Sequence, residues 1–395
     1  MIPAGAAPSI IATAQGNPAP AQARPHPGRY ILEHAVPSDD AALRNLVRST
    51  PMDGPMRLSL EREPDFFRAA KIGNIATEVI VGREVDGGRV VSTASRAIRR
   101  AYVDGSEQSL GYLSSLRILK DAAGSTLLAR GYRYLRELHD DARAPYYITT
   151  ILEGNRAAEN ILTSERAGLP AYVPFGRLRT YLVPLYRRAR RMARGSVARC
   201  AVSADVSPAL ECLNQFNAGL QFAPVYKPED LGAGSHMLCG LSAGALYLHC
   251  RGETIDGTLA VWDQQRFKQA VVSGYSPWLA ALRPFLAFGS HFGLAPRLPA
   301  AGHTLPCLYA ALLSSRDSNQ GVFEELFETV VAERSQAGFA YLLLGLSDRH
   351  PFCEVVERRA AMKIVSTIYL VYWRDRAPDR LPSRERIPHL EVATL

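Results

Sequence analysis

Two carboxylates stand where they could remove a proton from an amine or a hydroxyl group. Glu78 lies on a predicted strand, residues 76–81, and Glu153 directly follows another predicted strand, residues 146–152. A general base must come within hydrogen-bond reach of the proton that it removes, and these two residues are the carboxylates best placed by element order. A solvated surface carboxylate is the alternative interpretation of each, so the pattern names two candidates for one role.

A second kind of chemistry is indicated by Gly124, Ser125 and Thr126, which precede apolar residues at helical spacing. The first amide N–H groups of a helix have no intrahelical partner, and the helix dipole draws an anion toward them. Glycine lets the backbone approach such an anion closely. The segment could therefore bind a phosphate group through its backbone, and an ordinary capped helix start is the alternative.

The motifs of several other enzyme classes are missing from the sequence. It contains no G-x-S-x-G elbow, no H-E-x-x-H zinc motif, no phosphate-binding P-loop and no dinucleotide fingerprint. Its six cysteines form no C-x-x-C pair, so we expect reduced thiols in a cytoplasmic protein and no metal. Hydrolase, protease, NTPase and oxidoreductase functions therefore have no support.

The elements that must position these residues follow the order β-α-α-β-β-β-α-β-α-β-β. After a strand over 30–36 and two short helices, Asp-Gly turns separate strands over 76–81, 89–102 and 109–119. Helical spacing from Ser125 predicts the next helix, and the strand 146–152 follows it. Asn155 is placed to cap a further helix, and two strands, near Tyr172 and over 178–185, close the unit.

The second half of the chain repeats much of this order without a residue-by-residue match. Strands are predicted over 199–202, 246–250, 258–262, 307–313, 339–346 and 364–373, with an extra segment over 264–304. We therefore predict an α/β protein with domains over 29–186 and 199–395 and a linker over 187–198. The Ala-, Pro- and Gly-rich residues 1–28 read as a disordered tail.

Charge and hydropathy limit the classes of partner that we expect for this protein. The 395 residues carry a net charge of +8, which attracts polyanions in general. No aromatic–basic interleaving and no recognition helix is visible, so we do not expect nucleic acid. No window reaches the roughly 18 consecutive apolar residues that a membrane helix needs, and the N-terminus does not read as a secretory signal, so we expect no membrane.

Residues 111–184 resemble the GNAT superfamily of N-acetyltransferases. GYLSSLRILKDAAGSTLLARGYRYLREL is similar to the fourth strand, cofactor loop and third helix of that family, and YYITTILEGNRAAENILTSERAGLPAY to its fifth strand and fourth helix. The resemblance extends over 30–185, and a fainter one covers 199–373. The chain thus resembles a tandem-GNAT protein with a degenerate second domain, each domain having a mixed, mostly antiparallel sheet flanked by helices.

The resemblance implies where a donor would bind. In this family the fourth and fifth strands diverge, the pantetheine arm of acetyl-CoA or another acyl-CoA pairs with the exposed backbone, and the pyrophosphate lies on the loop that opens the third helix. A backbone N–H of the fourth strand polarises the thioester carbonyl. The residues implied are the backbone of Leu116 and Ile118 for the arm, Gly124, Ser125 and Thr126 for phosphate, and Asn155 for the arm or the strand–helix junction.

The sequence departs from the family at two places. The signature R/Q-x-x-G-x-G/A falls on Ala123, Thr126 and Leu128, none of which matches, and Leu162 stands where the family often has a tyrosine acid. Arg316 to Gly321 offers only a partial match in the second half.

Three interpretations follow from these departures. The chain could bind acyl-CoA through backbone contacts, take the phosphopantetheine of an acidic acyl carrier protein as donor, or serve as a non-catalytic module that binds a carrier protein or ligand. We predict an acyltransferase that moves an acetyl or longer group to a small-molecule or peptide amine.

Overall fold

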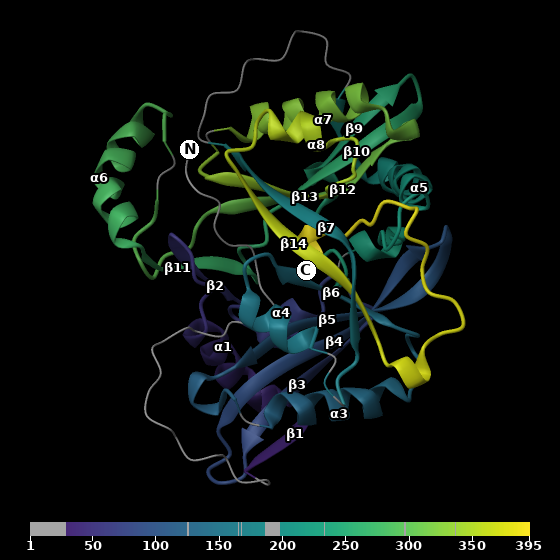
Figure 1. Cartoon of the computed structure of the whole chain (residues 1–395). Helices are drawn as coiled ribbons and strands as arrows, with labels where there is room; N and C mark the ends of the chain where they lie inside the picture. The colour runs from purple at the N-terminus through teal and green to yellow at the C-terminus, as the bar shows by residue number, and fades with distance from the viewer. Residues whose placement is uncertain are drawn as a thin grey trace.

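One continuous sheet of twelve strands forms the centre of the protein (Figure 1). The computed structural model describes residues 29–185 and 198–395, apart from Ser125, Glu165, Ala167, Ala233, Pro296, Arg297 and Gln336. The strands follow the order β1 (Tyr30–His34), β3 (Ala76–Glu84), β4 (Val90–Val103), β5 (Ser106–Ile118), β6 (Tyr147–Leu152), β14 (Met362–Tyr372), β7 (Ala171–Pro184), β13 (Tyr341–Ser347), β12 (Cys307–Ser315), β10 (Thr254–Trp262), β9 (Leu246–Arg251) and β8 (Ala198–Cys200).

The sheet is mixed and mostly antiparallel, as expected from the sequence. Among its named strands only two neighbouring pairs, β5 with β6 and β12 with β13, run parallel. Each of these pairs is joined by a helix, α3 (Leu127–His139) in the first half and α7 (Gln320–Arg334) in the second. A parallel pair needs such a crossover, so the two halves share the same strand–helix–strand unit.

The halves exchange their last strands. β14 comes from the second half and pairs with β6 of the first, while β7 comes from the first half and pairs with β13 of the second. The chain boundary predicted at 187–198 therefore does not divide the sheet, and most of that segment lies outside the described residues, as does the tail 1–28. The domain boundaries stay a prediction about the chain.

The two closing strands expected near Tyr172 and over 178–185 are one strand, β7, and this expectation was wrong. The register against β14 shifts where Ile368 pairs with Gly176 and Tyr369 with Pro174, which leaves Phe175 as an extra residue. A proline that cannot donate and a bulged neighbour break the alternation of the sequence, so one long strand reads as two.

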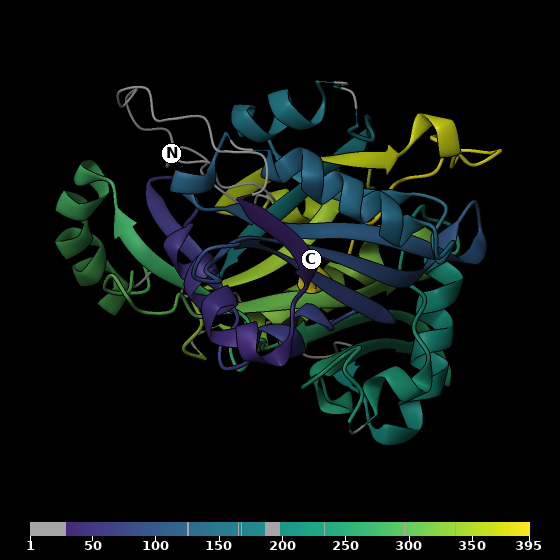
Figure 2. The same cartoon turned by 90° about the horizontal axis from the view of Figure 1, so that it is seen from below.

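Helices cover both faces of the sheet (Figure 2). On one face α3 and α4 (Arg156–Leu162) pack over the first half, and α7 and α8 (Cys353–Glu357) pack over the second. On the other face lie α1 (Asp40–Ser49), α2 (Phe66–Ala70) and α5 (Val206–Asn217), together with the C-terminal residues. The core that contains Tyr112, Ile148, Ile368 and Val392 joins the halves on this second face.

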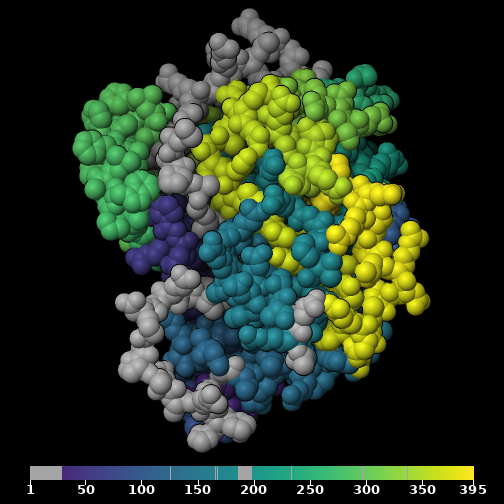
Figure 3. Space-filling model, in the orientation of Figure 1, coloured from purple at the N-terminus to yellow at the C-terminus, as the bar shows by residue number. Residues whose placement is uncertain are grey.

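A second, two-stranded sheet ties the halves together at one side. β2 (Met56–Glu61) pairs with β11 (Gln269–Tyr275), and α6 (Pro277–His291) follows as a lobe at the edge of the molecule (Figure 3). The sequence analysis predicted no strand between the two short helices and missed β2, because the partner of β2 lies far along the chain. No helix among the described residues is long and apolar enough to cross a membrane.

Candidate active site

β5 and β6 diverge soon after they meet. Their pairing is limited to Gly111 with Tyr147 and Tyr112 with Ile148, whereas β5 continues to Ile118. Beyond this pairing, a side-chain hydrogen bond connects the two strands: Thr149 Oγ1 donates to the carbonyl of Leu113 over 2.8 Å. The divergence expected between these two strands is therefore confirmed, and the edge of β5 beyond Tyr112 has no described strand beside it.

A bulge lies in the unpaired part of β5. Ser115 and Leu116 stand opposite the single residue Ala94 of β4, and Ser115 has a φ of 58°. A non-glycine residue in this left-handed region is strained and persists only where its surroundings hold it. Arg62 supplies such a hold, since its Nη2 donates to Ser115 Oγ over 2.7 Å. The bulge turns the backbone of β5 toward the gap.

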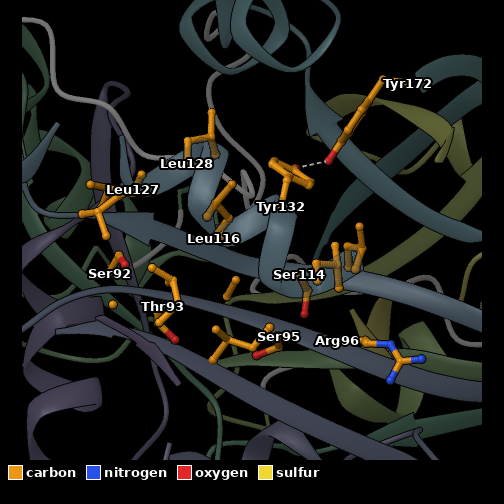
Figure 4. Close-up of a pocket in the computed structure, with 18 residues that line it drawn as sticks. Ser92, Thr93, Ser95, Arg96, Ser114, Leu116, Leu127, Leu128, Tyr132 and Tyr172 are labelled. Carbon is orange, nitrogen blue, oxygen red and sulfur yellow. Dashed lines mark hydrogen bonds between the residues drawn. The ribbon is translucent and has the colours of Figure 1, made fainter. Parts of the chain in front are cut away.

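An apolar pocket of about 630 Å³ lies between the sheet and α3 (Figure 4). Leu116 and Ile118 line it from β5, and Leu127, Leu128 and Gly131 line it from α3. A Cβ atom added at Gly131 would meet no atom within 4 Å, which shows open space beneath the helix. The bonded hydroxyls of Tyr132 and Tyr172, two further lining residues, lie at the top of the view.

A second pocket of about 790 Å³ lies on the other face of the sheet. Its wall includes Arg62, Arg117 and Lys268, and we call it the cationic pocket. Thr150 of β6 also lines it, while the neighbouring Ile151 packs under α3 and α4 on the opposite face. Ser114, next to the bulge, lines both pockets, so the two cavities meet at the diverging strands.

Burial and mutual repulsion lower the affinity of the cationic groups for their protons. Burial lowers the pKa of Arg62 to about 10, and the pKa of Arg117 falls to about 10 through burial and the charge of Arg62. The pKa of Lys268 falls to about 7 through burial and then through Arg62 and Arg99. No Asp or Glu is among the described residues that line this pocket. Arg62 and Arg117 stay protonated at neutral pH, so the wall of the cavity is cationic.

The two candidate carboxylates lie outside both pocket linings. Glu78 accepts from Arg96 Nη1 over 2.6 Å and also pairs with Arg143. Glu153 is exposed at the end of β6, 3.0 Å from Arg177 Nε. The structure does not bring the two together, and a catalytic role for either stays a prediction.

The residues expected at the phosphates lie at the start of α3. Gly124 has a φ of 76°, which suits glycine, and Thr126 makes no side-chain cap bond. Ser125 lies outside the described residues. Asp121, on the same loop, is 2.7 Å from Arg89, which offsets its negative charge. Binding of phosphate by this loop stays a prediction.

Asn155 caps α4, as its position in the sequence indicated. Its side chain accepts from the backbone N–H of Ala158 over 3.2 Å. Leu162, at the place of the family's usual tyrosine, is buried in the core under α4. The structure thus places no acid there, and a role of Asn155 at a donor arm stays a prediction.

The second half contains the same geometry in a filled form. β12 pairs with β13 only from Cys307 to Tyr309, and Leu312 and Leu313 bulge opposite Leu259, with a φ of 51° at Leu312. Glu391 of the C-terminal segment accepts from the backbone N–H of Leu312 over 3.0 Å.

Further side chains close this second gap from both faces. Val392 packs so tightly on β13 that a Cβ atom at Gly345 would collide with it. On the other face, under α7, the rings of Phe323 and Phe352 stack with centroids 4.3 Å apart. The side chain of Asn319, in the partial match noted above, accepts from the N–H groups of Gly321 and Val322.

Comparison with known proteins identifies the fold. No protein-family model and no curated protein matches the chain. N-myristoyltransferase of Saccharomyces cerevisiae, crystallised with bound myristoyl-CoA, aligns with a TM-score of 0.57 and 11% identity over 92% of this chain and 85% of that one. A GCN5-related N-acetyltransferase from Sphaerobacter thermophilus aligns with a TM-score of 0.58 and 14% identity over 91% and 99% of the chains. The protein has the fold of the GNAT superfamily, so the expected fold is confirmed.

The sequence missed the residues that give the cationic pocket its charge. Arg62 directly follows β2 and Lys268 directly precedes β11, and nothing local in the sequence indicates that these two strands pair. Arg117 carried a signal, because it is a charged residue inside a strand of apolar neighbours. Among the described residues no group of three or more His, Cys, Asp or Glu could hold a metal ion.

Proposed function

We propose that this protein is an N-acyltransferase whose reaction takes place at the bulge of β5. The observation that carries the proposal is the divergence of β5 and β6 beyond Tyr112, with one pocket on each face of the sheet and Ser114 in the wall of both. A donor that lies in the gap would present its thioester to an acceptor that enters from the opposite face.

The donor we propose is an acyl-CoA. Its pantetheine arm would pair with the backbone of β5 near Leu116 and Ile118, and its phosphates would lie on Gly124 to Thr126 at the start of α3. The apolar pocket supports an acyl chain longer than acetyl, because each buried methylene contributes about 0.8 kcal/mol to binding. The similar N-myristoyltransferase was crystallised with myristoyl-CoA, which agrees with this choice.

The chemical step is direct transfer. The amine nitrogen attacks the thioester carbonyl carbon, a C–N bond forms, the C–S bond breaks, and the amine proton is lost while the thiolate gains one. Backbone N–H groups at the bulge would stabilise the oxyanion. Among the described residues no Asp or Glu side chain lines the cationic pocket, and its positive charge would lower the pKa of an incoming amine and favour the neutral nucleophile. The proton then leaves through water.

A carrier-bound donor is the second possibility. The net charge of +8 would attract an acidic acyl carrier protein. All six cysteines are free, which fits the cytoplasm, where we propose that the protein acts.

Direct measurement tests the proposal. Purified protein is incubated with acetyl-CoA, myristoyl-CoA or an acyl carrier protein and a mixture of amines, and amide products are identified by mass spectrometry. Thermal shift with CoA reports binding without catalysis. Amide formation together with stabilisation by CoA supports the enzyme. Stabilisation without any product would instead indicate a non-catalytic module, and the absence of both product and stabilisation would contradict the whole proposal.

A further inference from the structure

No described Asp or Glu side chain forms an ion pair with Arg62 or Lys268 in the cationic pocket. Arg62 forms no ion pair with a described residue, and although its Nη2 is bonded to Ser115, its Nη1 is buried without a hydrogen-bond partner. Lys268 donates to a main-chain oxygen of Leu395, the last residue of the sequence, over 2.6 Å, and its ammonium has two further hydrogens to give. Donors therefore remain that face the cavity.

Arg96 is a buried arginine with a structural role, and it provides a comparison within the same protein. Arg96, whose side chain is fully buried, donates to Glu78 over 2.6 Å, to Asp141 and to the hydroxyl of Tyr147. Removing a cation from water is costly unless a counter-charge compensates it. Arg96 has its counter-charges within the fold, whereas Arg62 pairs with no described Asp or Glu and lines the cavity.

Resting on the proposed acyl transfer, we infer that the acceptor is a small amine that also bears a carboxylate, as an amino acid does, and that Arg62 and Lys268 bind this carboxylate. The planar fork of a guanidinium matches a carboxylate, and an ammonium adds a second donor. Arg117, in the same wall, strengthens the attraction.

The position of Arg62 sets the spacing between the two groups of the acceptor. Because Arg62 is hydrogen-bonded to Ser115 of the bulge, an anion held by Arg62 lies beside the site where the thioester is attacked. A carboxylate separated from the amine by one carbon fits this short span. The phosphates of the donor are expected elsewhere, at the start of α3 on the opposite face of the sheet.

Matched acceptors test the inference. Initial rates with the best donor are measured for leucine against 3-methylbutylamine, tyrosine against tyramine, and each amino acid against its amide. We expect kcat/KM to be higher for the amino acid in every pair. Arg62→Gln should then lower kcat/KM for the amino acids about 10- to 100-fold more than for the decarboxylated amines, whose own change reports the loss of the contact with Ser115 at the bulge. Arg62→Lys should recover part of the loss.

Two further variants control for folding and position. Lys268→Gln is an independent change at the same pocket and should act in the same direction. Arg57→Gln removes an exposed arginine from β2, five positions before Arg62, and should change neither acceptor class. Circular dichroism of each variant shows whether it folds.

Three outcomes would overturn the inference and leave the proposed transfer intact. Equal rates for amino acids and their decarboxylated amines would show that the carboxylate is not bound. A rise in the KM of the donor in Arg62→Gln would assign the cations to CoA, and phosphoethanolamine as the best acceptor would assign them to a phosphate. If no acceptor reacts, stabilisation of the wild type by amino acids that is lost in Arg62→Gln supports the inference, and its absence contradicts it.

Discussion

The two halves of this protein place the same bulge beside the same divergent pair of strands, but only the first half leaves the gap open. Beside Ser115 lie an apolar pocket on one face and a cationic pocket on the other. Beside Leu312 the corresponding space holds Glu391, Val392 and a stack of phenylalanines. The difference teaches that the fold alone does not make a site. A bulge with unpaired backbone serves a ligand only where the protein does not fill the gap itself.

The largest effect should come from filling the open half. Gly131→Leu directs a side chain into the space under α3, and we expect transfer from myristoyl-CoA to fall about 100-fold or more, equivalent to roughly 2.7 kcal/mol of barrier. Acetyl transfer should fall less, because a short chain needs less of the pocket. Rates with both donors measure this.

Two controls compare helices and halves. Arg133→Leu changes an exposed residue of α3. Glu324→Leu changes the residue of α7, in the filled half, that corresponds in position along the helix to Gly131 of α3. Neither should alter transfer. A variant Gly131→Leu that still transfers myristoyl at the wild-type rate would show that the chain does not lie in this pocket.

In the filled half, Glu391 should make the free energy of unfolding depend on pH. Burial raises the pKa of Glu391 to about 7, above the 4.5 of the unfolded chain. The folded state therefore holds more protons between these values, and the free energy of unfolding should fall by roughly 3 kcal/mol as pH rises from 4.5 to 7. Urea unfolding at pH 5 and pH 8 measures the difference.

Substitutions at Glu391 separate its charge from its hydrogen bond. Glu391→Gln should abolish this pH dependence and be more stable than wild type at pH 8. Glu391→Ala leaves the N–H of Leu312 without an acceptor and should cost about 1–3 kcal/mol at pH 5. A wild type whose stability is flat over this range would mean that Glu391 is not held as described.

A smaller effect distinguishes the two helix starts. Asn319 caps α7 with its side chain, so Asn319→Ala should cost about 1 kcal/mol. Thr126 makes no such bond before α3, and Thr126→Ala should stay within about 0.5 kcal/mol. Thermal or urea unfolding compares them. Equal losses would show that the two starts are capped alike.

The smallest expected effect is the uptake of a fraction of a proton when an amino acid binds. With a pKa of about 7, Lys268 is largely neutral at pH 8, and a bound carboxylate would raise that pKa and draw a proton in. Calorimetry of amino acid binding in buffers of different ionisation enthalpy should show uptake of less than about one proton at pH 8 and little at pH 6. Uptake that persists in Lys268→Gln would assign the proton to another group.

The sequence by itself determined the order of the elements from β3 to α4, which include the two strands that flank the gap. Turn residues, caps such as Asn155 and the change from alternating to helical spacing after residue 124 are signals between near neighbours in the chain. They located β5, α3 and β6, and the resemblance then predicted the divergence of the strands, which the pairing confirms.

Only the tertiary structure decided which residues face that gap. The exchange of β7 and β14, the pairing of β2 with β11 and the meeting of Arg62 with Lys268 join segments far apart in the chain. The same holds for Glu391, which closes the second gap from a distant segment. Such contacts depend on strand register and on packing across a sheet, and a one-residue slip would turn each side chain to the opposite face.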